Sequence, residues 1–479
     1  MLARELASLE PAAVQRAGLH PLPASIPPLL PCAHAPAAGR CTCAACAAHY
    51  AALATAQHAW AGQRDDAWRD IHAAHWSRVT AAERERFALA ATAAALARLL
   101  CAYCGTTPRA TIAAEVQACV AEVDKGIMMN DPRRNAPLHG VMCLLEMLLE
   151  ELAPAPAPAA VPSPLSPPLS LSLPLPLSSA VECSSACGPS SRNEGVAGCA
   201  SATLCAPPRL HLPSLDTFAQ ACVQAAQPAV LTGCTSAWPA CGAGDGMRAW
   251  HDLAYLVRVA GHRLVPVEVG AHYMSRAWHT ELMSLSHFIH TYMLPTTRPA
   301  PATPAYLAQH MLPAQVPALQ ADFSIPDYTV CTLPALDATT ATTGSSVPSS
   351  AADECAGVDT VAAQAAEDVA VNMWLGPGGT VSCLHWDAPH NLLAQVFGRK
   401  RIRLYAPLAT RDMYAADAPM QNTSRVDVEC VDAAQFPHFP ATPDYDFILE
   451  AGDMVYIPPG WWHHVRSLDA ACSLSFWWR

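Results

Sequence analysis

The apolar residues of this chain follow two spacings, one before residue 152 and another after residue 209. In the first region they recur three and four positions apart over residues 67–104, 111–129 and 137–152. This spacing places them along one side of a helix. The pattern predicts a helical domain over residues 1–152.

Short strands are predicted after residue 209, where glycine and proline interrupt the apolar runs. The strand-like runs are residues 262–270, 371–387, 391–407, 447–468 and 472–478. Many short strands, with one long excursion between the third and fourth of these runs, are typical of a double-sheet jelly roll. We therefore expect an α+β chain, a helical domain followed by a jelly-roll barrel whose mouth is a natural place for a small-molecule site.

Two stretches show neither pattern. Residues 153–208 are rich in proline and serine, and proline removes backbone donors, so they predict a disordered linker. Residues from about 335 to 367 are rich in alanine, threonine and serine and predict a low-complexity insertion. The barrel domain is then expected over residues 209–479, with this insertion inside it.

Composition narrows the class of protein. The formal net charge of −12 argues against direct nucleic-acid binding, which needs a basic face, and it suits a basic protein partner. The first residues carry acidic groups and no long apolar run, so we expect a reducing compartment, the nucleus or the cytoplasm. We expect no membrane span, because the apolar stretch Phe87–Cys104 carries Arg98 and follows a helical pattern.

Cysteines are frequent, with 20 in the chain. Two groups in the helical region could suggest zinc, Cys41, Cys43 and Cys46 in one and Cys101 and Cys104 in the other. Zinc pairs more often stand in glycine-rich knuckles, whereas these lie in alanine-rich helical sequence. We favour free thiols over a zinc site.

The segment "HWDAPHN", residues 385–391, is a candidate for part of a metal site. Alternation along a strand places His385 and Asp387 on one face, with Asn391 in phase if the strand continues. The histidine–carboxylate spacing alone is weak, because "HTE" at 279–281 repeats it. A third ligand is available in "PPGWWHHV", where alternation lets only one of His463 and His464 face inward. Two histidines and one carboxylate suit Fe(II) better than zinc.

A lysine supports this interpretation. In "GRKRIRLYAP" the three arginines at 399, 401 and 403 share one face, and a solvated edge strand explains them. Lys400 falls on the other face with Ile402 and Leu404. A buried ammonium is costly unless an anion meets it, and a bound dicarboxylate would supply that anion.

Residues 379–407, 422–429 and 457–478 strongly resemble the JmjC-domain 2-oxoglutarate oxygenases, which have a cupin-like double-stranded β-helix. The resemblance is closest to the lysine-specific demethylase 8 / arginyl hydroxylase branch. It continues through residues 237–270 and 306–328, so it covers nearly all of 209–479, and residues 67–81 echo that branch weakly. The linker and the insertion match no family.

The resemblance implies a role for each matching position. It implies Fe(II) ligands at His385, Asp387 and His463, which leaves His464 as the spare imidazole. It implies 2-oxoglutarate binding by Tyr306, Ser382, Asn391, Lys400 and Trp374. It places Glu268 and Trp278 where this branch receives a cationic substrate side chain. A carboxylate with an aromatic plane also suits guanidinium or ammonium on physical grounds.

The expected function is therefore an Fe(II)- and 2-oxoglutarate-dependent dioxygenase that uses O2 and hydroxylates arginine side chains of a basic protein. Lysine demethylation of a histone tail is the alternative within the family. A catalytically inactive JmjC fold that serves as a binding module is a third hypothesis, and the intact His385, Asp387, His463 and Lys400 argue against it.

Overall fold

The computed structural model describes residues 44–73, 79–103, 108–152, 205–275, 277–294, 301, 303–332 and 369–479. Most of the predicted linker and all of the predicted insertion lie outside these residues. The domain boundaries therefore stay predictions.

In the described part of the N-terminal region four helices form a layer, and their apolar faces pack into a common core. Helix α4 lies between α3 and α5, with Leu96 and Leu99 fully enclosed. Thr80 and Glu83 cap its start reciprocally, since each side chain accepts a hydrogen bond from the other's backbone N–H. The helices are α3 (Ala44–Ala73), α4 (Ala81–Tyr103), α5 (Arg109–Met129) and α6 (Ala136–Leu152), with a 3-10 turn η2 (Pro132–Arg134).

The apolar stretch from Phe87 belongs to α4 and packs inside this layer, as the helical pattern predicts. No helix in the described part of the chain combines the length and apolarity needed to cross a membrane.

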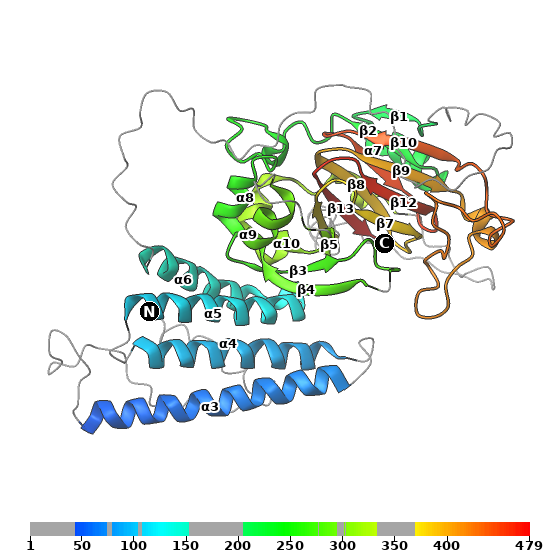
Figure 1. The fold of residues 1–479 in the computed structure, drawn as a ribbon. Helices are drawn as coiled ribbons and strands as arrows, with labels where there is room; N and C mark the ends of the chain where they lie inside the picture. Colours follow the sequence, from blue (N-terminus) through cyan, green and yellow to red (C-terminus); the bar gives the residue numbers. More distant parts are fainter. Residues whose placement is uncertain are drawn as a thin grey trace, which may run out of the picture.

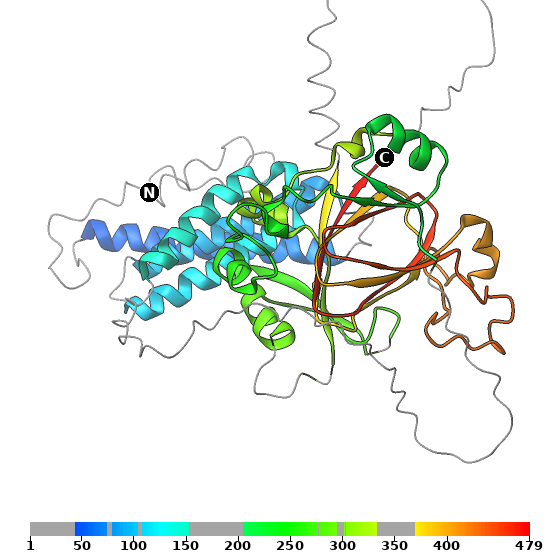
Figure 2. The same cartoon turned by 90° about the horizontal axis from the view of Figure 1, so that it is seen from above.

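The rest of the described chain is a two-sheet barrel, which confirms the predicted α+β jelly roll (Figures 1 and 2). The nine-stranded sheet has the order β1-β2-β11-β8-β13-β6-β5-β3-β4, and the four-stranded sheet has the order β10-β9-β12-β7. The strands are β1 (Arg209–His211), β2 (Ala229–Thr232), β3 (Leu264–Val269), β4 (His279–Ser284), β5 (Ala305–His310), β6 (Ala370–Gly376), β7 (Val381–His385), β8 (His390–Phe397), β9 (Lys400–Tyr405), β10 (Tyr445–Leu449), β11 (Met454–Ile457), β12 (Trp462–Ser467) and β13 (Ala471–Trp478).

Short helices cover the outer face of the nine-stranded sheet. Residues of α8, α9 and α10 share a core with apolar side chains of that sheet. They are α7 (Leu215–Phe218), α8 (Leu253–Ala260), α9 (Leu285–Phe288) and α10 (Leu312–Gln315), with turns η3 (Ala219–Gln224), η4 (Pro239–Cys241), η5 (Ile289–Met293), η6 (Pro317–Asp322), η7 (Asp327–Val330) and η8 (Pro407–Asp412).

A second core fills the space between the two sheets. It includes Leu393 and Val455 from the nine-stranded sheet and Ile402, Leu404 and Phe447 from the four-stranded sheet. The inner face of the barrel is therefore packed, and polar side chains on that face stand out as functional candidates.

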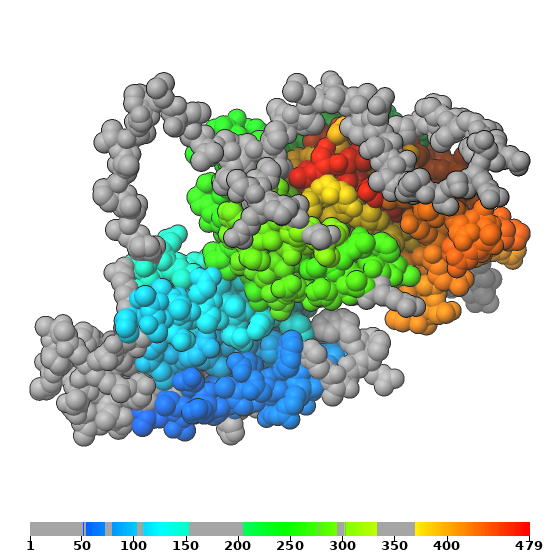
Figure 3. Space-filling view, viewed as in Figure 1, coloured from blue at the N-terminus to red at the C-terminus, as the bar shows by residue number. Residues whose placement is uncertain are grey.

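The N-terminal helices lie against the barrel on the side of α10 and β3. Helix α5 contacts both elements. In Figure 3 the N-terminal helices, in blue and cyan, lie directly against the green part of the barrel domain.

Candidate metal centre

Three polar side chains converge where β7 and β12 meet at the mouth of the barrel. His385 ends β7, Asp387 follows two residues later, and His463 is the second residue of β12 and pairs with His385. One ligand atom from each lies within 4.8 Å of the others. Among the described residues this is the one group of three or more His, Cys, Asp or Glu side chains that could hold an ion.

A β-bulge brings both Ser382 and His385 into this site. His463 and Val465 are two residues apart on β12, but their partners His385 and Ser382 are three apart on β7. The extra residue in β7 changes which face the next side chain points to. Strict alternation would have separated Ser382 from His385, yet both line the same cavity.

Hydrogen bonds orient the two imidazoles. His385 Nδ1 lies 2.7 Å from the carbonyl of Cys383, and His463 Nδ1 lies 3.0 Å from the carbonyl of Trp461. A proton on each Nδ1 satisfies these carbonyls and leaves Nε2 with a free lone pair. Burial, followed by the charge of His463, lowers the pKa of His385 to about 4, so its imidazole is neutral at pH 7.

Asp387 supplies the carboxylate. Its Oδ1 lies 3.9 Å from His385 Nε2, and its Oδ2 lies 3.5 Å from His463 Nε2. Burial alone would raise its pKa, but the interactions with His463 and His385 outweigh burial and leave the pKa lowered. Oδ2 is enclosed and accepts no hydrogen bond from the described residues. The neutral imidazole of His385, with His463 Nε2 and an ionised, unsatisfied carboxylate beside it, fits a divalent metal ion.

Lys400 is buried beside this group, on the apolar face where the strand pattern predicts it. Its exposed fraction is 1%, and Nζ donates to the hydroxyl of Tyr306 over 3.2 Å. Burial lowers the pKa of Lys400 to about 8. No carboxylate in the described part of the chain forms an ion pair with it, whereas Arg401 and Arg403 on the opposite face both bind Asp446.

The other expected cosubstrate residues line the same cavity. Trp374 donates from Nε1 to Ser475 Oγ over 2.9 Å, and its ring centroid lies 6.1 Å from that of Tyr306. Asn391 lies with Ser382 in the wall, and its Oδ1 is enclosed with no hydrogen-bond partner in the described chain.

The prediction that Asn391 lies in phase on the same strand as His385 is wrong, although the Asn391 side chain does reach the site. Strand β7 ends at His385, and Asn391 belongs to β8 of the opposite sheet. Its side chain therefore does not face the cavity by staying in phase along one strand. The chain crosses between sheets at residues 386–389, and β8 brings Asn391 back from the facing wall.

Trp477 is a residue of the site that was not predicted from the sequence. It pairs with Asn391 across β13 and β8, lines the cavity, and its indole Nε1 is enclosed without a partner among the described residues. The alternation of Ser473, Ser475 and Trp477 along β13 was the available signal, because these polar or amphipathic side chains share one face of an otherwise apolar strand.

Glu268 and Trp278 lie beside the cavity rather than in its wall. Glu268 pairs with Tyr306 across β3 and β5. Burial raises the pKa of Glu268, and the Trp278 indole opposes this shift. Gly270, at φ 141°, allows the chain to turn closely under Trp278, since a Cβ there would lie 2.9 Å from Trp278 Cα. The structure thus brings the expected substrate pair together.

His464 points away from the triad, as alternation requires for one of the two histidines. It lines a separate cavity with Arg466 and Asp427. Burial, followed by the charge of Arg403, lowers the pKa of His464 to about 3. It is not part of the group that could hold a metal.

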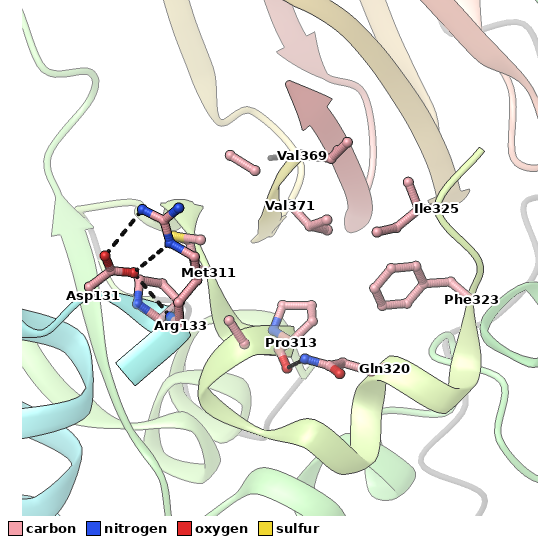
Figure 4. A pocket seen from close by; sticks show the side chains of 12 residues that line it. Asp131, Arg133, Met311, Pro313, Gln320, Phe323, Ile325, Val369 and Val371 are labelled. Atoms are coloured by element: carbon pink, nitrogen blue, oxygen red, sulfur yellow. Dashed lines mark hydrogen bonds and ion pairs between the residues drawn. The ribbon is translucent and has the colours of Figure 1, made fainter. Parts of the chain in front are cut away.

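Another cavity, of about 540 Å³, lies where the turn between α5 and α6 meets the barrel (Figure 4). At its rim Arg133 donates to Asp131, and the rest of its lining is mostly apolar, including Met311, Pro313, Phe323, Ile325, Val369 and Val371. It contains no member of the triad. Cys41, Cys43 and Cys104 lie outside the described residues, so the choice between zinc and free thiols there is untested.

Comparisons with known proteins identify the family of the barrel. Residues 215–479 match the model of the family described as "Cupin-like domain". The chain is 39% identical over 275 residues to Jumonji C domain-containing protein 5 of Drosophila melanogaster, covering 57% of this chain and 60% of that protein.

Two further relatives are similar over the same region. Identity is 38% over 273 residues with lysine-specific demethylase 8 of Xenopus tropicalis, covering 57% of this chain and 52% of the relative. It is 37% over 266 residues with lysine-specific demethylase JMJ30 of Arabidopsis thaliana, covering 55% and 53%. The match thus spans less than two thirds of the length of each relative. The chain belongs to the cupin-like family, and its barrel is a JmjC domain of that family.

Proposed function

We propose that the chain is an Fe(II)- and 2-oxoglutarate-dependent oxygenase that hydroxylates arginine side chains of a basic protein. One observation carries this proposal. The possible metal ligands His385, Asp387 and His463 share a cavity with Lys400, a buried ammonium that meets no carboxylate in the described part of the chain. A metal site with an unmatched cation beside it fits a cosubstrate that chelates the metal at one end and carries a carboxylate at the other.

The protein residues hold and orient the reactants. Nε2 of the two histidines and a carboxylate oxygen of Asp387 would hold the Fe(II). Lys400 and the Tyr306 hydroxyl would bind the far carboxylate of 2-oxoglutarate, and Asn391, Ser382 and Trp374 would enclose it. When bound, Fe(II) and 2-oxoglutarate supply the oxidation that places one oxygen atom of O2 on a substrate carbon. The packed inner walls of the barrel exclude water from this reaction.

The substrate class follows from Glu268 and Trp278. A half-buried carboxylate can accept hydrogen bonds from a guanidinium, and an indole plane can stack on it. The position of Glu268 next to Tyr306 would direct such a side chain toward the metal. The net charge of −12 also favours a basic protein partner.

Lysine demethylation of a histone tail is the second candidate. Two similar proteins carry the name lysine-specific demethylase, and a carboxylate beside an aromatic ring also suits a methylated ammonium. Oxidation of an N-methyl carbon by the same chemistry yields an unstable product that releases formaldehyde.

Succinate formation tests the enzyme. The full chain would be incubated with Fe(II), 2-oxoglutarate, O2 and panels of histone and ribosomal peptides. We expect peptide-dependent succinate and a mass gain of one oxygen atom on an arginine. Loss of a methyl group with formaldehyde would instead establish demethylation. Absence of turnover with every peptide, unchanged by Asp387→Ala, would leave the JmjC fold as a binding module.

A further inference from the structure

The N-terminal helices contribute one fully enclosed carboxylate to the barrel. Asp124 of α5 has an exposed fraction of 0%, and its main partner Arg263, just before β3, has 1%. Arg263 donates to Asp124 Oδ1 from Nε over 2.9 Å and from Nη2 over 2.6 Å. The same guanidinium reaches the carbonyl of Gln315 over 2.9 Å and Glu146 of α6 over 3.3 Å. Asp124 therefore depends on Arg263 for its counterion, whereas Arg263 without Asp124 would keep only the longer contact with Glu146.

Asp124 also holds the backbone of β3. Its Oδ2 accepts from the N–H of Leu264, the first residue of β3, over 2.8 Å. Gln315 donates from Nε2 to the carbonyl of the same Leu264 and to Asp124 Oδ1, each over 2.8 Å. Both main-chain polar groups of Leu264 are thus fixed by side chains, one of which comes from the helical layer.

These side-chain bonds to Leu264 matter because β3 has few backbone pairings with the rest of its sheet. It pairs with β5 at only two positions, Glu268 with Tyr306 and Val269 with Ala305. On its other side it pairs with β4, which is the last strand of the sheet. At Leu264, where β3 does not pair with β5, the side chains of Asp124 and Gln315 therefore bind the β3 backbone in place of a neighbouring strand.

We propose that Asp124 is a positioning residue for the substrate side of the active site. It anchors the start of β3, and so sets the place of Glu268 four residues later and of Trp278 in the turn between β3 and β4. The helical layer then serves substrate engagement, whereas the metal and 2-oxoglutarate residues sit on other strands. The role of Asp124 in substrate binding rests on the proposed function, but its support of the β3 backbone does not.

The test uses the full chain with Asp124→Ala and the milder Asp124→Asn. Glu122→Gln is the matched control, since Glu122 lies on the same helix but pairs with Arg64 and Lys125 inside the helical layer. We expect hydrogen exchange of residues 264–269 and 279–284 to accelerate by about tenfold or more in the Asp124 variants. Exchange in β7, β9 and β12 should stay within about twofold of the wild type. KM for a basic peptide should rise by about tenfold, with KM for 2-oxoglutarate unchanged within about twofold.

Unchanged exchange in β3 and β4 in a folded Asp124 variant would overturn the anchoring, and so would equal increases across all strands. If Asp124→Ala fails to fold, the double variant Asp124→Leu/Arg263→Met removes both charges together and gives the same readout. An unchanged peptide KM would remove the positioning role of Asp124 in substrate binding while leaving the proposed function intact. A wild-type protein that turns over no peptide would instead overturn the proposed function, and hydrogen exchange would still decide the anchoring.

Discussion

Lys400 Nζ lies 3.2 Å from the hydroxyl of Tyr306, and the two residues come from opposite sheets of the barrel. The hydroxyl gives the buried ammonium one polar contact but no compensating charge. Lys400 is therefore a buried cation in the wall of the cavity that the triad also lines.

Lys400→Met should weaken 2-oxoglutarate binding and stabilise the ligand-free protein. We expect affinity to fall by at least about 30-fold, because the carboxylate would lose its buried ionic partner. Calorimetry at pH 7 would measure this. Arg401→Met is the matched control, since Arg401 neighbours Lys400 but binds Asp446 on the other face; loss of binding in both variants would contradict the assignment.

The lowered pKa of Lys400 has a consequence for stability against pH. Its pKa is about 8 in the folded protein, against the ordinary 10.5 of a lysine in the unfolded chain, so the unfolded chain binds more protons between these values. The free energy of unfolding should therefore rise with pH from about 8 to 10.5, by an amount on the order of 3 kcal/mol. Urea unfolding at a series of pH values should show that the free energy of unfolding rises less steeply with pH in Lys400→Met than in the wild type. Equal pH dependences would exclude Lys400 as the cause.

The adjacent histidines offer a matched pair of variants. His463→Gln should weaken Mn(II) binding by more than about 100-fold, because it removes an inward ligand. His464→Gln should leave metal affinity unchanged, although it alters a buried side chain and should lower the melting temperature. Metal titration followed by thermal shift distinguishes the two. Comparable metal loss in both variants would mean that His464 also reaches the ion.

Glu268→Gln should raise KM for an arginine peptide by about tenfold or more, since a neutral amide binds guanidinium more weakly than a carboxylate. KM for 2-oxoglutarate should not change. Glu281→Gln on the neighbouring strand β4 is the control, because Glu281 is exposed and pairs with Val267 rather than with a site residue. An unaltered peptide KM in Glu268→Gln would place the substrate pocket elsewhere.

Trp477→Phe should raise KM for 2-oxoglutarate by about fivefold, because it keeps an aromatic side chain but removes an enclosed N–H that has no partner within the described chain. Trp478→Phe serves as the comparison, since its N–H is already bonded to the carbonyl of Cys331 over 2.7 Å. That variant should lose stability and keep its KM. The reverse result would show that Trp477 only packs.

Much of the organisation could be predicted from local pattern. Three-and-four spacing predicts α5 and α6, and alternation predicts the buried Lys400 beside outward arginines, because both are properties of a single element. Asn391 and Trp477 could not be found in this way. Each reaches the cavity because its strand lies opposite or beside another that is distant in the sequence.

The sequence by itself determined the helical and strand-like regions of the chain, the histidine–carboxylate motif and the place of Lys400 on the apolar face of its strand. Each of these depends on residues close along the chain. Only the tertiary structure decided how the bulge in β7 aligns Ser382 with His385, which sheet brings Asn391 to the cavity, and that Asp124 of a distant helix supports β3. These depend on register, on a change of sheet and on burial between separate elements, and such long-range contacts leave no periodic signal in the residues that make them.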